Sequence, residues 1–256
     1  MINYKIILEY DGSRYNGWQR QGNTENTIQG KLEQIIGRYF DQHIEIHGSG
    51  RTDAGVHALG QVANFKVDPR LAPVFINVND LSAIFTDLNS FLPEDIRIID
   101  LSVADERFHS RLNAVSKIYR YRISLSSKKS VFARKYCTSI VESLDINLMK
   151  EASRMFLGEH DYGCFSDTKT KKSTVRYVDS ITFNEETNGT DRYLVVDFHG
   201  NGFLYHTVRL MMGTLIKIGL GECPADIIND IFSSGNRKLV PYMAPAEGLI
   251  LYEVKY

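Results

Sequence analysis

Apolar and polar positions alternate along the first residues of the chain. Apolar side chains occupy every second position from Ile2 to Tyr10, which is typical of a β-strand with one face in a core. Apolar residues at helical spacing then predict an amphipathic helix over residues 28–40, with Asn26 or Thr27 as its N-cap. The chain is therefore expected to begin with a strand followed by a helix.

The same two periodicities predict the rest of the first half. Short strands are expected at residues 44–46 and 63–67, a helix over 81–88, and another strand over 96–103. The segment Gly48–Ala58 joins the two short strands. A segment in that position is held by a rigid scaffold, which is where functional loops are found.

The second half of the chain has a similar content. The predicted strands cover 117–125, 175–183, 193–198 and 249–254, and the predicted helices cover 146–156, 203–220 and 224–232. Asn188-Gly189 indicates a hairpin between two of these strands. We expect an α/β (α+β) fold with two pseudo-symmetric halves, 1–107 and 108–256, each a mainly antiparallel sheet with helices, forming a central catalytic cleft.

Composition places the chain among ordinary globular proteins. Hydrophobic residues make up 43% and charged residues 24% of the 256 residues. No apolar run approaches the roughly 18 residues of a membrane helix, and no basic and apolar leader is present, so a cytoplasmic protein is expected. The cysteines Cys137, Cys164 and Cys223 are odd in number and widely spaced, which argues against a disulfide framework and against a zinc site.

Charge is distributed unevenly along the chain. The net charge is −1, yet the basic tract from Arg107 to Lys135 holds nine Lys and Arg residues and no acidic residue. Aromatic residues such as Phe108 and Tyr119 are interleaved with these cations. The tract predicts a track for a nucleic-acid backbone, and a solvated basic face is the alternative.

The segment Gly48–Ala58 is the densest in chemistry. It combines three glycines with Arg51, Asp53 and His57. Asp53 is suited to act as a nucleophile, a base or a metal ligand, and the alternative is a turn residue that satisfies backbone donors. A metal-dependent hydrolase would need convergent ligands, and the candidates His47, Asp53, His57 and His109 show no standard spacing.

Two other segments carry functional side chains. The turn over residues 11–20 places Trp18 between Arg14 and Arg20, which suits contacts with bases and phosphates, although a core role for Trp18 is equally compatible with the sequence. Arg209 is a strong cation inside the apolar pattern of 203–220. A buried arginine needs an anion.

Taken together, these segments resemble the tRNA pseudouridine synthase A family. The resemblance runs in the family's order from residue 10 to the C-terminus. The matching segments include Tyr10-Asp11-Gly12, Gly17-Trp18-Gln19-Arg20-Gln21, Gly50–Ala58, Phe108-His109 with Arg111, Tyr119-Arg120-Tyr121, Gly202-Phe203-Leu204, Val208-Arg209 and Gly248-Leu249.

The resemblance implies an isomerase that converts uridine to pseudouridine within tRNA, without a cofactor or a metal. Asp53 matches the family's catalytic aspartate, which attacks either the ribose or the base. Tyr119 matches the tyrosine that packs against the target base, Arg209 the arginine that pairs with the aspartate, and Arg51 an arginine implicated in flipping the base. By analogy the substrate is the anticodon stem-loop and the assembly is a homodimer.

The remaining candidate contacts with the substrate share a basic or aromatic character and lie in or beside matching segments. They are Arg14, Trp18, Arg20, His57, Phe108, His109, Arg111 and Arg120. A non-catalytic protein that binds structured RNA is the alternative. It would explain the basic tract but would leave Asp53 as an anion within a site for phosphates.

Overall fold

The computed structural model describes residues 1–128, 131–168 and 172–256. This part of the chain contains ten strands and five α-helices, and its strands form one mainly antiparallel sheet. The predicted α+β class with a mainly antiparallel sheet is therefore confirmed. Two compact units make up the chain: the first comprises residues 1–115 and 251–256, and the second comprises residues 116–250.

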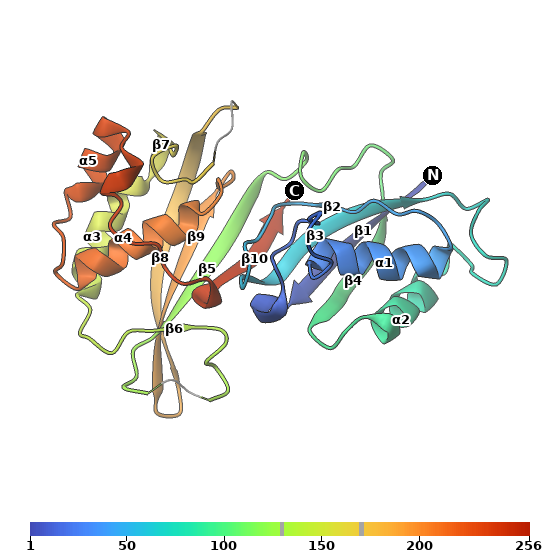
Figure 1. Cartoon of the computed structure of the whole chain (residues 1–256), viewed down its shortest axis with the longest axis horizontal. Helices are drawn as coiled ribbons and strands as arrows, with labels where there is room; N and C mark the ends of the chain where they lie inside the picture. The colour runs from blue at the N-terminus through green and yellow to red at the C-terminus, as the bar shows by residue number, and fades with distance from the viewer. Residues whose placement is uncertain (129–130, 169–171) are drawn as a thin grey trace. The chain divides into compact units, whose positions relative to one another are not determined.

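The first unit is built from strands β1 to β4 and two helices (Figure 1). In its sheet β1 lies between β3 and β4, β2 pairs with β3, and every pairing is antiparallel. The elements are β1 (Ile2–Tyr10), α1 (Ile28–Phe40), β2 (His47–Gly48), β3 (His57–Val67), α2 (Leu81–Phe91) and β4 (Ile96–Ala104).

Helix α1 follows directly from its sequence pattern. Thr27 is the N-cap and its side chain accepts a hydrogen bond from the backbone N–H of Gly30. The apolar side chains of Ile28, Leu32, Ile36 and Phe40 are fully buried. The ring of Phe40 stacks on Tyr4 of β1 at 5.9 Å between ring centroids. Phe65 of β3 packs on Tyr4 as well, at 5.3 Å. The predicted helix over 28–40 is confirmed.

The strand predicted at residues 44–46 is wrong. Ile44 and Ile46 are buried, as their apolar character predicts, but they do not form a strand. The strand in this region is β2, which begins at His47, directly after the predicted range. Side chains of α1 form hydrogen bonds with the backbone of Ile46. Glu33 accepts from its N–H at 3.2 Å, and Gln29 donates to its carbonyl at 3.1 Å. Because both groups are satisfied by the helix, this backbone makes no strand ladder.

The second unit contains strands in the order β5, β9, β8, β7, with β6 beside β5. Its pairings are antiparallel except that β6 runs parallel to β5. Strand β10 (Leu249–Lys255) has residues in both units. The others are β5 (Ser116–Ser124), β6 (Thr138–Ser139), β7 (Gly158–Asp161), β8 (Val175–Asn188) and β9 (Asp191–Gly200).

The hairpin predicted at Asn188-Gly189 is confirmed, because Asn188 of β8 pairs with Asp191 of β9 and Gly189 adopts a φ of 60°. The helices are α3 (Ile146–Ser153), α4 (Thr207–Gly219) and α5 (Ile227–Ser234), and 3-10 turns cover Gly12–Arg14, Arg154–Phe156, Arg237–Leu239 and Ala246–Gly248. Within the described ranges, every helix falls short of the length and apolarity needed to cross a membrane.

Helix α4 begins later than predicted. The apolar pattern starts at Phe203, but the first helical residue is Thr207. His206, which precedes it, has a φ of 67° in the left-handed region, so a right-handed helix cannot run through this position. The helix itself is almost wholly buried, as an apolar pattern on all sides predicts.

Trp18 lies in the core of the first unit. Its side chain is 2% exposed, and a Cβ atom placed on Gly48 would lie 2.5 Å from two of its ring atoms. The indole therefore packs directly on the backbone of β2, where only a glycine fits. Of the two roles that the sequence leaves open, this burial favours packing.

We predict that Gly48→Ala lowers the free energy of unfolding by about 1–3 kcal/mol, because the added methyl group overpacks the contact with Trp18. Urea unfolding of the purified variant measures this loss. Gly22→Ala is the control, since a Cβ there meets no atom within 4 Å. Equal stability of the two variants would contradict the packing described here.

Candidate active site

The segment Ser49–Val56 leads from β2 into β3 and is called the catalytic loop below, after the candidate nucleophile Asp53 that it carries. At its start the backbone N–H of Ser49 donates to the carbonyl of Val62 at 2.7 Å. At its end the N–H of Val56 donates to the carbonyl of Asp53 at 3.1 Å, which closes a turn with Gly55 at a φ of 79°. Both ends of the loop are therefore tied to fixed backbone.

The turn over residues 11–20 holds the loop from one side. Trp18 donates its backbone N–H to the carbonyl of Thr52 at 3.0 Å, and the hydroxyls of Tyr10 and Thr52 lie 2.9 Å apart. At Gly12 a Cβ atom would lie 2.0 Å from the carbonyl oxygen of Val56, so backbone meets backbone there. Thr52 and Val56, on either side of Asp53, are both buried.

Buried polar side chains hold the loop from below. Gln61 of β3 is fully buried, and its Oε1 lies 2.6 Å from the hydroxyl of Ser49. Its Nε2 donates to the carbonyl of Gly50 at 2.9 Å. These bonds satisfy groups that the loop buries and fix its path.

Asp53 lies at the tip of this fixed backbone. The residue is half-buried, between buried Thr52 and exposed Ala54. The loop therefore presents a carboxylate from a rigid support, as the glycine-rich segment predicts.

Arg51 is exposed on the same loop. Its Nε donates to Oε1 of Gln19 at 2.8 Å. Gln19 lies in a segment that matches the family but was not among the candidate site residues, because its place opposite Arg51 depends on how the turn packs against the loop.

His57 is 3% exposed at the start of β3. Its Nδ1 accepts the backbone N–H of Gly12 at 3.0 Å and lies 3.2 Å from Oδ1 of Asp11. The imidazole thus joins β3 to the turn, which is a structural role. Its predicted contact with substrate stays a prediction.

The two arginines of the turn are ion-paired within the first unit. Arg14 donates from Nε and Nη2 to Asp95 at 2.9 and 2.6 Å, and Tyr15 donates to the same carboxylate at 2.6 Å. Arg20 lies 3.3 Å from Glu33 of α1. Both arginine side chains are 63% exposed, so each retains a surface toward solvent.

Phe108, His109 and Arg111 lie near the other end of β3. Phe108 packs against Tyr256 at 5.1 Å between ring centroids, and His109 stacks on His47 at 4.8 Å. Burial, followed by the nearby His47, lowers the pKa of His109 below its usual value. Across the described ranges, no three His, Cys, Asp or Glu side chains gather as metal ligands.

Tyr119 belongs to the second unit, on β5. Its side chain is 8% exposed, and Phe203 meets its ring edge-on at 5.4 Å between centroids. Phe203 lies in a segment that matches the family but was not among the candidate site residues. It fixes the plane of the tyrosine ring.

Arg209 is half-buried on α4. Its Nε donates to the carbonyl of Ala244 at 2.8 Å, and its own carbonyl accepts from the N–H of Ala244 at 2.9 Å. The same helix also carries Lys217, which pairs with Glu222 at 2.5 Å near the end of the helix. Arg209 is therefore the cation held within the apolar part of α4.

The segment before α4 is fixed by Asp167. Its carboxylate oxygens lie 2.7 Å from Nδ1 of His206 and 3.0 Å from Nε of Arg237. Burial acts to raise the pKa of Asp167, but the hydrogen bonds from His206 and Arg237 outweigh it, so the pKa lies below its usual value. This carboxylate helps to hold the left-handed residue from which α4 starts.

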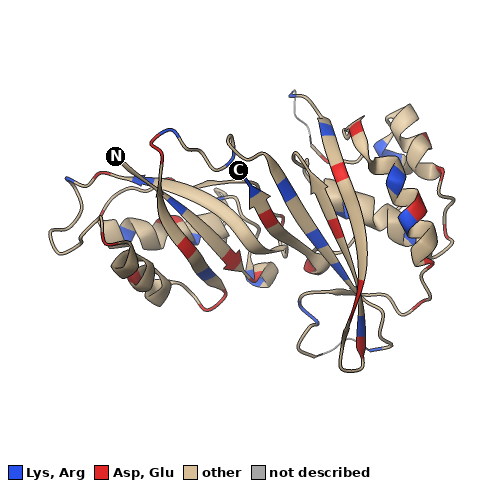
Figure 2. Cartoon of the chain, turned by 180° about the vertical axis from the view of Figure 1, so that it is seen from behind, with Lys and Arg blue, Asp and Glu red and all other residues tan. Residues whose placement is uncertain are grey.

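The basic tract is partly neutralised in the fold. Arg120 makes a two-pronged pair with Asp197 of β9, with both distances 2.8 Å. Arg122 lies 3.5 Å from Glu186 of β8 and packs over the ring of Tyr193. Figure 2 shows acidic as well as basic positions on the strands of this unit. Lys129 of the tract lies outside the described residues.

Comparison with known proteins identifies the family. A family model described as tRNA pseudouridine synthase matches residues 6–100 and 152–256. The chain is 43% identical over 257 residues to the tRNA pseudouridine synthase A of Bacillus sp. (strain KSM-64), with 100% of both chains covered. The chain belongs to the tRNA pseudouridine synthase family.

Other relatives of this family are similar over the same length. Identity is 41% to the tRNA pseudouridine synthase A 2 of Bacillus cereus (strain ZK / E33L) and 38% to the tRNA pseudouridine synthase A of Acetivibrio thermocellus, again with 100% of both chains covered. The resemblance drawn from the sequence motifs is confirmed. The chain is thus a tRNA pseudouridine synthase, which is an isomerase.

Asp167 generates a pH-dependent prediction. A carboxyl group with a depressed pKa stabilises the fold above its unfolded pKa, and this stabilisation is lost as pH falls through the folded pKa. We therefore expect Asp167→Asn to lower Tm at pH 7, and the difference from the unchanged protein to close below a pH of about 4. Thermal melts across this range provide the measurement, with exposed Asp100→Asn as the control. A difference that persists at low pH would contradict the assignment.

Proposed function

We propose that this chain converts uridine to pseudouridine in the anticodon stem-loop of tRNA, without a cofactor, and that Asp53 is its catalytic carboxylate. The observation that carries the proposal is the rigid loop that presents this carboxylate half-buried. The full-length relatives named tRNA pseudouridine synthase A support the reaction and the substrate class.

The reaction needs a nucleophile that bonds to a carbon of the ribose or of the base and is released again. The bond between ribose C1′ and uracil N1 breaks, the uracil turns, and C1′ bonds to ring carbon C5. N1 gains a proton and C5 loses one, so the atoms balance and no oxidant or reductant is consumed. Asp53 attacks either the ribose or the base, and both routes use the same carboxylate as nucleophile.

The catalytic loop suits this role because its backbone is fixed before substrate binds. Thr52 and Val56 are buried on either side of the aspartate, and the turn bonds directly to Thr52. A nucleophile held in this way enters the reaction with little reorganisation, which lowers the barrier.

Tyr119 packs its ring against the target base in this proposal, and its hydroxyl assists removal of the C5 proton. The edge-on contact with Phe203 supports this role because it sets the plane on which a base would stack. A base that leaves its helix loses stacking worth a few kcal/mol, and contacts of this kind offset the loss.

Arg209 pairs with Asp53 in this proposal. A guanidinium is suited to bind a carboxylate through charge-assisted hydrogen bonds, which would hold the nucleophile in one orientation. The bond of Arg209 to Ala244 uses Nε, so the two terminal nitrogens are the atoms assigned to Asp53. Asp53 and Arg209 come from the halves 1–107 and 108–256, which we propose to be pseudo-symmetric and to enclose the catalytic cleft.

The remaining basic and aromatic candidates contact the tRNA. Arg51 takes part in flipping the base, and exposed arginines bind phosphates. The residues assigned to these contacts are Arg14, Arg20, Phe108, His109, Arg111 and Arg120. Trp18 and His57 are buried, so we assign them to support of the turn and of β3 instead. We further propose that the enzyme acts as a homodimer in the cytoplasm, where tRNA is found.

We predict that Asp53→Asn abolishes pseudouridine formation while tRNA binding stays close to that of the unchanged protein. The amide has the shape of the carboxylate but is not a nucleophile. Pseudouridine in a tRNA transcript and the Kd for that transcript are measured together. Asp41→Asn is the control, because Asp41 is an exposed left-handed residue at the end of α1. Turnover by Asp53→Asn within about tenfold of the unchanged protein would contradict the role of Asp53.

We predict that Tyr119→Phe slows the chemical step about 10²-fold with little change in Kd, because it removes the hydroxyl and keeps the ring. Single-turnover rates with saturating enzyme test this. Tyr177→Phe on β8 is the control, since Tyr177 is exposed. A rate equal to that of the unchanged protein would show that the ring alone is used.

A further inference from the structure

Four polar side chains of the first unit form a continuous hydrogen-bonded chain. Glu33 accepts from Gln29 at 2.9 Å, and Gln29 accepts from Nε2 of Gln19 at 2.6 Å. Oε1 of Gln19 in turn accepts from Nε of Arg51 at 2.8 Å. These hydrogen bonds therefore connect helix α1 to Arg51 of the catalytic loop.

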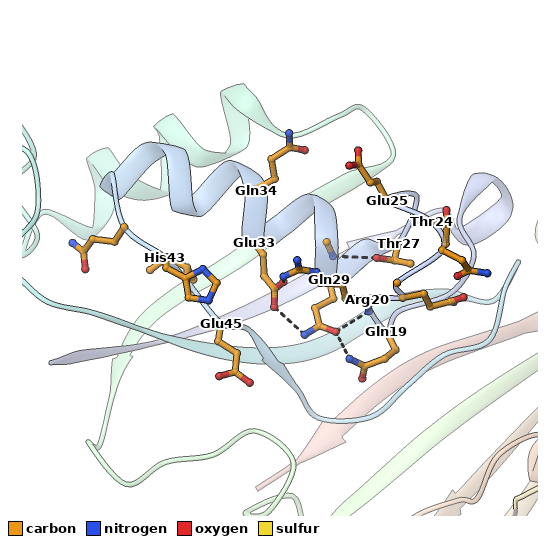
Figure 3. Close-up of a pocket in the computed structure, with 16 residues that line it drawn as sticks. Gln19, Arg20, Thr24, Glu25, Thr27, Gln29, Glu33, Gln34, His43 and Glu45 are labelled. Atoms are coloured by element: carbon orange, nitrogen blue, oxygen red, sulfur yellow. Dashed lines mark hydrogen bonds and ion pairs between the residues drawn. The ribbon is translucent and has the colours of Figure 1, made fainter.

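The direction of these bonds is fixed by backbone groups. Gln29 donates from Nε2 to the carbonyl of Ile46 at 3.1 Å, and its Oε1 accepts the N–H of Arg20 at 2.9 Å. A flipped Gln29 amide would set donor against donor and acceptor against acceptor at these positions. Gln29 is therefore held in one orientation, and Figure 3 shows its bonds to Gln19, Arg20 and Glu33.

The fixed amide of Gln29 sets the orientation of Gln19. Nε2 of Gln19 must face the acceptor on Gln29, so Oε1 is left to face Arg51. Glu33 supports this end of the chain, since it is 10% exposed and also accepts the N–H of Ile46. Gln19 is thus presented to Arg51 as an acceptor.

Arg51 gains a defined position from this contact. Within the described ranges no carboxylate pairs with it, and Gln19 is the side chain that receives its Nε. An arginine side chain that is already held loses less rotamer entropy when its ligand binds. Because the contact uses Nε, the two terminal nitrogens remain directed to whatever the loop binds.

Three of these hydrogen-bonded side chains, Gln19, Gln29 and Glu33, line a cavity of about 1100 Å³. This cavity is lined by Arg20 and His43 but also by three carboxylates, Glu25, Glu33 and Glu45. These carboxylates oppose the binding of phosphate in the cavity. The fixed orientation of the Gln19 and Gln29 amides is therefore better explained by the contact of Gln19 with Arg51 than by a ligand within the cavity.

We propose that Gln19 is a positioning residue, oriented by Gln29 and Glu33, which aims the guanidinium of Arg51 at the tRNA. This inference rests on the proposed function, in which Arg51 takes part in flipping the target base. Gln19 itself does not touch the reacting atoms.

A double-mutant cycle with Gln19→Met and Arg51→Ala tests the inference. Methionine has the length of glutamine but lacks the acceptor. We expect Gln19→Met to lower kcat/KM for tRNA about tenfold, Arg51→Ala to lower it at least as much, and the double variant to equal Arg51→Ala. Gln34→Met is the control, because Gln34 is exposed and lines the same cavity. It should behave as the unchanged protein.

Two results would overturn the inference: an unchanged kcat/KM in Gln19→Met, or the same loss from this substitution with and without Arg51. Tm values identify any loss of folding, and Gln19→Ala replaces the methionine variant in the cycle if that variant unfolds. If the unchanged protein binds tRNA but forms no pseudouridine, the proposed function fails and the inference with it. An active unchanged protein with additive losses rejects the inference alone.

Discussion

The turn of residues 11–20 contacts the catalytic loop with no space for side chains between the two backbones. A Cβ atom on Gly12 would meet the carbonyl of Val56 at 2.0 Å, and one on Gly17 would meet the carbonyl of Thr52 at 2.7 Å. Hydrogen bonds to Thr52 and His57 lie across the same contact. The position of Asp53 depends on this contact, because the contact holds Thr52 and Val56, the buried residues on either side of Asp53.

Charge in the folded chain differs from charge along the sequence. The basic tract contains no acidic residue, yet Asp197 and Glu186 reach Arg120 and Arg122 from neighbouring strands. A paired arginine binds phosphate less strongly than an unpaired one, since it already has an anion. Arg51 is different, because an uncharged amide holds it, and no carboxylate among the described residues pairs with it.

Local patterns predicted the elements whose backbone bonds are local or paired in regular ladders. Helix α1 and strand β1 follow directly from periodicity and capping. The predictions were wrong at two backbone positions. At Ile46 the side chains of Gln29 and Glu33 take the hydrogen bonds that a strand would use, and at His206 the backbone is left-handed. Glycines mark the loop of Asp53, the proposed nucleophile, whereas the contact of Gln19 with Arg51 has no local signal in the sequence.

The most direct test of the proposed activity is a map of pseudouridine in tRNA, at single-nucleotide resolution, from cells that make this chain and from cells in which it has been deleted. We expect pseudouridines in the anticodon stem-loop to disappear on deletion and to return when the chain is restored. An identical map in both kinds of cell would contradict the proposed activity on this stem-loop.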